Sequence, residues 1–317
     1  MKQRLLWADN LKALAIIYVF LVHAGGRVDK TLFNTGWFVM MPIFFFISGY
    51  FAKPVGIKNG FIKILKTLLL PAFIFGIVCN FVLHPEVIKL LLNSEFASVL
   101  QRLQDVIVTL GGYWFLTSLI LVELIYYMLS SCHIAIMKVV QPILMVWALI
   151  FPLFFANRAM PLSMNAMISG LAFFYVGNYY KKFENKLSLS KALSLVLFLT
   201  YIAASIIISA AYDAWLDVHL NIYNPVYATW MISLIGTFVC VSFFKNYPFD
   251  CDVLNYIGSN TLVLYMTNGL VNQGIFFFFK TDMNGTLYGL LVSCIGLLIC
   301  CGISYIVNKK LPCILGK

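Results

Sequence analysis

Long apolar stretches, separated by short polar segments, constrain the fold of this chain more than any other feature. Of its 317 residues, 62% are hydrophobic and 11% are charged, whereas soluble domains carry about 25% charged residues. A chain this apolar cannot cover itself with polar surface, so it has to lie in lipid. The sequence therefore predicts an all-α, polytopic integral membrane helix bundle.

The apolar stretches have the length of membrane-spanning helices. A helix needs about 20 apolar residues to cross the hydrocarbon core of a bilayer, which divides the chain into about ten spans. No linker or change of composition marks a second domain, so we expect one membrane domain over residues 1–317. Four prolines, Pro42, Pro71, Pro152 and Pro225, are predicted to kink helices or mark their ends. The predicted spans cover residues 11–26, 36–52, 64–83, 106–129, 138–156, 164–180, 192–212, 225–244, 257–279 and 286–307.

The basic residues predict how the chain is oriented. With the N-terminus inside, most lysines and arginines fall in inner segments, as the positive-inside rule requires. An even number of spans then places both termini in the cytoplasm, including the Lys309–Lys310 pair. The net charge of +10 is accounted for by these topology signals, so no nucleic-acid partner is expected. Residues 84–105 form the longest outer segment, where near-helical apolar spacing predicts an interfacial helix.

His23 stands near the outer end of the first span. Ionisable groups inside membrane segments are costly and usually functional, and histidine is the usual general base near neutral pH. Lys12 lies at the inner end of the same span, about 16 Å away along a helix. One helix is thus predicted to hold a cation at one side and a base at the other. The alternative is a hydrogen-bonded, inert structural histidine.

A second basic group precedes the third span. Lys63 and Lys66 are three residues apart and share a helix face. Beside Lys12, these two ammonium groups are suited to a multiply phosphorylated ligand. The alternative is that they only anchor the inner end of a helix, as lysines often do.

Glu123 is the clearest carboxylate within a span. Unpaired burial would cost several kcal/mol, so Lys63, Lys66 or Lys12 is an expected partner. Both a structural ion pair and a catalytic role fit this position.

Three further residues are candidate substrate contacts. Ser48 precedes a glycine that allows close helix approach and can itself hydrogen-bond across helices. No nucleophile elbow surrounds it, so it is not predicted to be a hydrolase nucleophile. Tyr113 and Trp114 are placed near the outer interface, where aromatic belts are also common.

The cysteines and the other histidines suggest no metal site. The eight cysteines lack metal-ligand spacing and mostly lie in or beside apolar runs, where cysteine acts as a small hydrophobe. We therefore expect neither a bound metal nor a disulfide framework. No role is assigned to His84, His133 or His219.

Taken together, these segments resemble the membrane-bound acyltransferase 3 family, whose members O-acylate bacterial surface polysaccharides. The opening 4-RLLWADNLKALAIIYVFLVHAG-25 resembles the family's first helix, and 41-MPIFFFISGYF-51 its phenylalanine-rich run ending in Ser-Gly-Tyr. The stretch 63-KILKTLLLPAF-73 stands where the family has two arginines, a leucine run and a proline. Two later stretches, 114-WFLTSLILVEL-124 and 257-IGSNTLVLYMTN-268, resemble later helices. The match runs through the chain in order.

The resemblance implies a multi-pass O-acetyltransferase of the bacterial inner membrane. Acetyl-coenzyme A would bind at the cytoplasmic face, and the acyl group would pass to a hydroxyl of a surface glycan or a lipid-linked sugar. His23 would act as base or acyl carrier, and Lys12, Lys63 and Lys66 would contact the donor's phosphates.

The chain departs from the family at several of these positions. Lysines replace its arginines and lose the bidentate fork, and Asn268 stands where a histidine is common. The main competing function is a transporter or exporter of a lipid-linked sugar or small solute, in which His23 and Glu123 form a proton relay. The matching broken helices of transporter repeats are not evident in the sequence. A purely structural membrane subunit is the third possibility.

Overall fold

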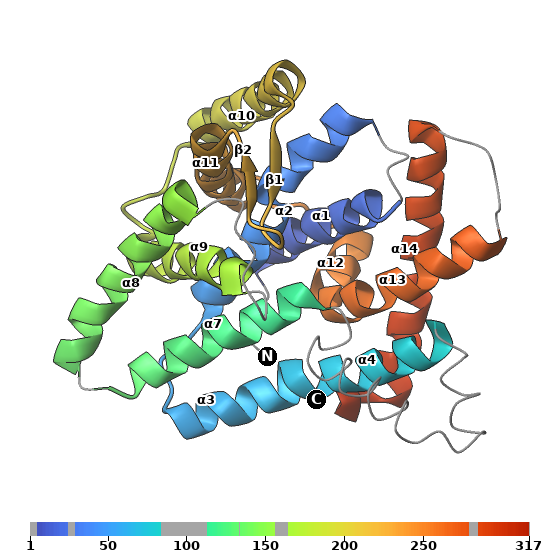
Figure 1. The fold of residues 1–317 in the computed structure, drawn as a ribbon, viewed down its shortest axis with the longest axis horizontal. Coiled ribbons are helices and arrows are strands. Elements are labelled where there is room, and N and C mark those ends of the chain that lie inside the picture. Colours follow the sequence, from blue (N-terminus) through green and yellow to red (C-terminus); the bar gives the residue numbers. More distant parts are fainter. Residues whose placement is uncertain are drawn as a thin grey trace.

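The structure is a computed structural model that describes residues 5–24, 29–83, 113–132, 134–155, 164–278 and 285–316. It is built from helices, with one short β-hairpin (Figure 1). The helices are α1 (Leu6–Val22), α2 (Lys30–Phe51), α3 (Ile57–Ile64), α4 (Leu70–Leu83), α7 (Trp114–Ser130), α8 (Ile134–Phe155), α9 (Met164–Phe183), α10 (Lys191–Tyr212), α11 (Val226–Asn246), α12 (Asp252–Ser259), α13 (Thr261–Phe278) and α14 (Thr286–Lys310). A π-helical turn, η1 (Leu65–Leu69), joins α3 to α4, and a 3-10 turn, η4 (Pro312–Leu315), follows α14.

The chain is a helical membrane bundle. Six helical segments in the described part of the chain are long and apolar enough to cross a membrane. Each of the ten predicted spans overlaps at least one of the helices above, while ten crossings and two cytoplasmic termini stay predictions. The predicted helix over residues 84–105 lies outside the described residues. The six segments are Lys30–Phe51, Ile57–Val78, Ile136–Phe155, Lys191–Tyr212, Val226–Asn246 and Thr286–Lys310.

Several boundaries differ from those predicted. The first helix begins at Leu6 rather than residue 11, because Asp9 and Asn10 find partners and need not lie outside lipid. Asn10 exchanges two hydrogen bonds with the backbone of Phe249, at 2.7 and 3.0 Å. The predicted span 257–279 is divided at Asn260, whose side chain donates to the carbonyl of Tyr256 at 2.8 Å and separates α12 from α13.

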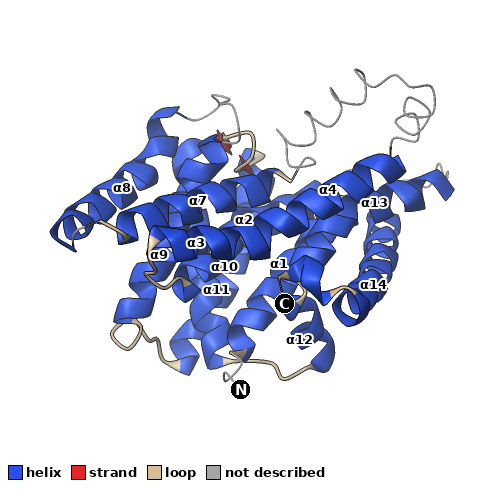
Figure 2. Ribbon diagram, turned by 90° about the horizontal axis from the view of Figure 1, so that it is seen from below, coloured by secondary structure: helices blue, strands red, loops and turns tan. Residues whose placement is uncertain are grey.

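Prolines shape two of the helical segments. Pro42 lies inside α2 and Pro152 inside α8, while Pro225 is the N-cap of α11. Pro71 lacks the N–H that would bond to the carbonyl of Thr67, and the π-helical turn η1 lies just before it. Helices α3 and α4 remain one continuous rod, which runs beside α7 (Figures 1 and 2).

The helices α2 and α9 pack backbone to backbone. A Cβ atom on Gly49 of α2 would lie 1.9 Å from the carbonyl oxygen of Phe174. In return, a Cβ atom on Gly177 of α9 would lie 2.1 Å from the carbonyl oxygen of Phe46. Only glycine permits this approach, which is a common device between membrane helices.

Side-chain contacts sort the helix ends into two groups. At one end, Glu184 lies 2.8 Å from the Nζ atom of Lys245 and accepts a 2.6 Å hydrogen bond from the Tyr50 hydroxyl. At the other, Lys30 pairs with Asp213 at 2.5 Å, and the Asp29 N–H donates to Thr286 at 3.0 Å. The first group falls in the segments predicted to be inner and the second in those predicted to be outer. We call these two sides the inner and the outer end.

A two-stranded hairpin at the outer end is the element that sequence reasoning missed. Strands β1 (Trp215–Asp217) and β2 (Ile222–Asn224) pair antiparallel between α10 and α11. Trp215 stacks on Phe33 and Trp37 of α2, with ring centroids 5.5 and 5.8 Å apart. The strands have three residues each, too few to give an alternating pattern in the sequence.

Candidate functional site

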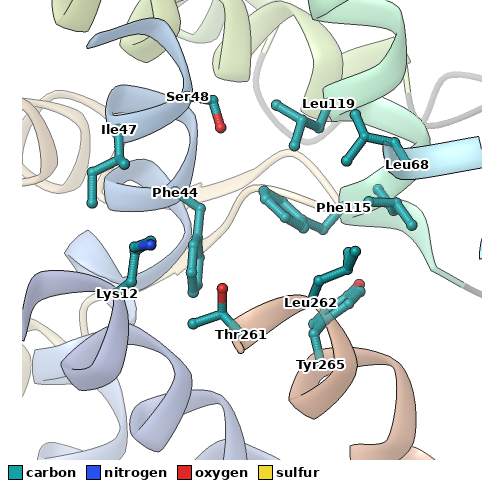
Figure 3. A pocket seen from close by; sticks show the side chains of 11 residues that line it. Lys12, Phe44, Ile47, Ser48, Leu68, Phe115, Leu119, Thr261, Leu262 and Tyr265 are labelled. Carbon is teal, nitrogen blue, oxygen red and sulfur yellow. The ribbon is translucent and has the colours of Figure 1, made fainter. Parts of the chain in front are cut away.

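Five of the helical segments enclose a cavity of about 170 Å³. Figure 3 shows the hydroxyls of Ser48 and Thr261 and the amine of Lys12 pointing into this space. Each sequence stretch that carried the family resemblance contributes at least one wall residue. We call it the central cavity; its lining residues are Lys12, Phe44, Ile47, Ser48, Leu68, Phe115, Leu116, Leu119, Thr261, Leu262 and Tyr265.

Lys12 is the cation of the central cavity. Its Nζ atom lies 2.9 Å from the carboxylate of Asp9, one helical turn earlier, and its side chain is 24% exposed. The ion pair offsets part of the cost of placing a charged side chain in an apolar wall. Lys12 is therefore placed to meet an anionic or carbonyl group that enters the cavity.

The Ser-Gly-Tyr set of α2 has three separate tasks. Ser48 turns its hydroxyl to the central cavity, and Gly49 admits the backbone of α9. Tyr50 donates to Glu184 at the inner end and lies 2.9 Å from the amine of Lys181. The set thus fixes α2 on two sides and presents one polar group to the cavity.

A polar seam on α13 leads from the central cavity to His23. Thr261, Tyr265, Asn268 and Asn272 share one face of the helix, since they stand four, three and four residues apart. Thr261 and Tyr265 line the cavity. Asn272 donates to the Oδ1 atom of Asn268 at 2.8 Å and to the carbonyl oxygen of His23 at 3.3 Å. The asparagines are buried, so the seam is packed rather than hollow.

His23 lies at the far end of this seam, as the C-cap of α1 rather than inside the helix. Its backbone N–H donates to the carbonyl of Val19, and its side chain is exposed. His23 stands eleven positions after Lys12 on the chain, and Asn272 stands eleven positions after Thr261. Helices α1 and α13 contact each other, and the interval corresponds to about 16 Å of helix on each.

Lys63 and Glu123 form a separate ion pair on α3 and α7. The Nζ atom of Lys63 lies 3.4 Å from Glu123 and donates to the Tyr127 hydroxyl at 2.7 Å. The expected partner of Glu123 is therefore found. Neither residue lines the central cavity, and Lys66, in the π-helical turn, does not line it either and is exposed. Of the three predicted phosphate-binding lysines, the structure brings only Lys12 into the cavity.

Tyr113 and Trp114 flank the site at the start of α7. Tyr113 donates to the carbonyl of Met266 at 2.8 Å and its ring lies 5.8 Å from that of Tyr265, beside the seam. Trp114 instead stacks on His219 of the hairpin at 4.9 Å. Burial lowers the pKa of His219 and the charge of Asp217 opposes this, with a net lowering. At neutral pH the hairpin therefore presents an uncharged imidazole to Trp114.

Sequence reasoning missed Thr261, Tyr265 and Asn272. Their signal was present, because these polar residues recur at helical spacing within an otherwise apolar run. In the described ranges, no group of three or more histidine, cysteine or acidic residues is placed to hold a metal ion.

Comparison with known proteins gives one match. The model of the acyltransferase 3 family, described as an acyltransferase domain, matches residues 5–305. No curated protein and no solved structure matches the chain.

Proposed function

The chain belongs to the acyltransferase 3 family and is a multi-pass membrane acyltransferase; from that premise we propose that it is an O-acetyltransferase. The donor is acetyl-coenzyme A at the cytoplasmic face of a bacterial inner membrane. The acceptor is a hydroxyl of a cell-surface glycan or a lipid-linked sugar on the other side.

The arrangement of the central cavity and the polar seam supports this proposal. The cavity opens among residues of every family-like stretch and holds the cation Lys12. From it, the seam of α13 reaches the backbone of His23. About 16 Å of helix separates Lys12 from His23, a distance within the reach of a donor with an anionic end and a long flexible arm, although the seam between them is packed in this structure.

The chemistry assigned to His23 follows from the acyl-transfer reaction. As base, the imidazole takes the proton of the acceptor hydroxyl while the oxygen attacks the thioester carbonyl. The C–S bond breaks, the C–O bond forms, and the thiolate of coenzyme A takes the proton from the imidazolium. As acyl carrier, the imidazole attacks first and the hydroxyl then displaces it. Both routes consume one hydroxyl and one thioester and release one ester and one thiol.

The three lysines predicted to bind the donor contribute unequally in this proposal. Lys12 contacts the donor from within the cavity. Lys63 and Lys66 contribute charge near the inner end, although Lys63 already holds Glu123. Glu123 is kept as a candidate catalytic residue, with the ion pair to Lys63 as its structural alternative. Ser48, Tyr113 and Trp114 are the proposed substrate contacts.

Radiolabelled acetyl-coenzyme A, supplied to membranes that contain or lack the protein, tests the reaction. We expect label in a glycan or lipid-linked sugar only when the protein is present. His23→Ala should lower the transfer at least a hundredfold, because removing a general base costs about 10²–10⁴ in rate. His133→Ala, at a histidine with no assigned role, is the matched control.

Two results together would overturn the proposal. One is that no label reaches any acceptor from acetyl-coenzyme A. The other is that His23→Ala cells carry the same surface acylation as wild-type cells, measured by mass spectrometry of the glycan.

A further inference from the structure

A second, larger cavity of about 440 Å³ lies between α1, α2, α10 and α11. It is separate from the central cavity, with which it shares no lining residue. Its walls include the rings of Tyr18, Phe198 and Tyr201 and the side chains of Met40, Ile202 and Cys240. We call it the lateral cavity.

The lateral cavity extends along α2. Its lining residues on this helix run from Asp29 to Ile43, a separation of fourteen residues or about 21 Å of helix. The lining residues Leu32 of α2 and Ile206 of α10 are 40% and 45% exposed. Since α2 and α10 are long and apolar enough to cross a membrane, this exposed side faces lipid. A mostly apolar lining of this length suits a single extended aliphatic chain.

Polar groups mark the outer end of the cavity. Asp29, Thr31 and Thr35 line it there. One carboxylate oxygen of Asp29 caps α2 and the Thr35 hydroxyl donates to the carbonyl of Thr31, which leaves the second carboxylate oxygen and the acceptor sites of the hydroxyls for a hydroxyl-bearing head group. The buried Tyr201 is a further polar residue in the lining. Apolar pockets with a few polar groups at fixed points are typical ligand sites.

The polar end of the lateral cavity and His23 lie near each other in the sequence. Asp29 follows His23 by six residues, and its backbone N–H donates to Thr286 at the start of α14. The carbonyl of His23 accepts from Asn272 of α13, the helix that precedes α14. Asp29 and the exposed side chain of His23 are thus both assigned to the outer end of the bundle.

We propose that the lateral cavity binds the aliphatic anchor of the acyl acceptor, an amphiphile with a single extended chain and a hydroxyl-bearing head. The inference rests on the proposed function, since only an acceptor needs its hydroxyl beside His23. The occupant enters from the membrane plane, its chain passes between Tyr18 and Tyr201, and its head stays at the outer end.

Photo-cross-linking tests the site. The probe is a dodecyl glucoside with a diazirine in the chain, added to vesicles of phosphatidylethanolamine and phosphatidylglycerol that contain the full protein. We expect mass spectrometry to find the label on the cavity-lining residues of α2 and α10. Ile202→Trp fills the cavity and should lower this labelling at least fivefold. Leu199→Trp, on an exposed residue of the same helix that does not line the cavity, should leave it unchanged.

A second pair of variants distinguishes filling of the cavity from misfolding of the protein. Ile206 lines the cavity and its neighbour Ile207, 64% exposed, does not. Ile206→Trp should lower the labelling and Ile207→Trp should not. Equal labelling in both members of each pair, or labels spread over α8 and α14, would overturn the proposal. So would equal labelling of the cavity by a photoreactive phosphatidylcholine, which would mark it as a site for bulk lipid.

The transfer assay separates this proposal from the proposed function. His23→Ala should be labelled as well as wild type, because occupancy of the cavity does not require the imidazole. Labelling confined to the lateral cavity, without acetyl transfer in any assay, would exclude the O-acetyltransferase function. It would then also exclude the identification of the occupant as the acceptor. Acetyl transfer without labelling confined to the lateral cavity would exclude only the proposal that this cavity binds the acceptor.

Discussion

Lys12 differs from Lys63 and Lys181 because it lines the central cavity. Its side chain is 24% exposed, against 48% for Lys63 and 51% for Lys181. A charge that water screens less has more effect on a bound anion. The contribution to donor binding should therefore be largest at Lys12.

Replacing Lys12 tests this expectation. Lys12→Gln should raise the KM for acetyl-coenzyme A about tenfold to a hundredfold, because a hydrogen bond to a charged group contributes about 1.5–3 kcal/mol. The turnover number should change little. Steady-state transfer by membranes at varied donor concentration gives both constants.

Two further variants interpret the result. Lys186→Gln removes a charge from the exposed turn after α9 and should leave the KM as in wild type. Asp9→Asn combined with Lys12→Gln keeps the net charge of the site and separates poor folding from poor donor binding. An unchanged KM in Lys12→Gln would exclude Lys12 as a donor contact.

The carboxylate of Glu184 predicts a pH effect at the inner end. Burial disfavours its charged form, but the hydrogen bonds from Lys245 and Tyr50 outweigh this and lower the pKa of Glu184. The stabilisation is then complete above the unfolded pKa of about 4.3 and is lost as the pH falls through the lower, folded pKa.

Melting curves of the detergent-solubilised protein check this. Glu184→Gln should lower the melting temperature by roughly 2 °C at pH 7, since a partly exposed ion pair contributes about 1 kcal/mol or less. The difference from wild type should shrink as the pH falls from 5 toward 3. A difference that stays constant over this range would show that Glu184 acts through packing instead.

At the scale of elements, the pair α2 and α9 depends on two glycines. Gly49→Ala and Gly177→Ala should each destabilise the protein by more than 2 kcal/mol, because the new methyl group meets a backbone carbonyl that cannot move aside. Gly269→Ala and Gly274→Ala in α13 are matched controls, since a Cβ there meets nothing within 4 Å.

The fraction of protein that stays monodisperse after heating in detergent measures this stability. We expect Gly49→Ala and Gly177→Ala to aggregate at clearly lower temperatures than both controls. If all four variants melt alike, α2 and α9 do not pack as closely as described.

The sequence was a good guide to the helices and a weaker one to their ends. Apolar length alone predicted spans that each overlap a helix in the described part of the chain. It could not foresee that Asn10 would pair with Phe249, 239 residues away, and so placed the start of α1 too late. It also ran α12 and α13 together, because the hydrogen bonds of Asn260 that divide them are not visible in hydropathy.

The same limit applies to the site. Lys12 and Ser48 were predicted and share the central cavity, and Lys63 was among the expected partners of Glu123. The seam of α13 went unnoticed, since its threonine, tyrosine and asparagines gain meaning only when α1 lies alongside. Trp114 was chosen for its place near an interface, but its stacking partner His219 belongs to a hairpin that the sequence did not predict.

At the scale of the whole molecule, three exposed native cysteines can test the orientation. Cys132, Cys251 and Cys313 lie in segments predicted to be cytoplasmic, and all three are free thiols. A maleimide that cannot cross membranes should label none of them in intact cells and all of them after permeabilisation. Mass spectrometry of the peptides gives the result at each site.

Two labelling patterns in intact cells would contradict the predicted orientation. Labelling of Cys313 in intact cells would place the C-terminus outside and require an odd number of spans if the N-terminus is inside. Labelling of all three would invert the whole bundle and put His23 on the cytoplasmic side.

Helix α1 is the first to be made and among the last to be completed. The side-chain amide of Asn10 donates to the carbonyl of Phe249. The backbone carbonyls of Phe20 and His23 accept hydrogen bonds from Ser293 and Asn272. None of these partners exists until most of the chain has left the ribosome. During biogenesis the polar face of α1 must therefore be sheltered by the insertion machinery, and a nascent chain stopped before residue 249 exposes it to lipid and to quality control.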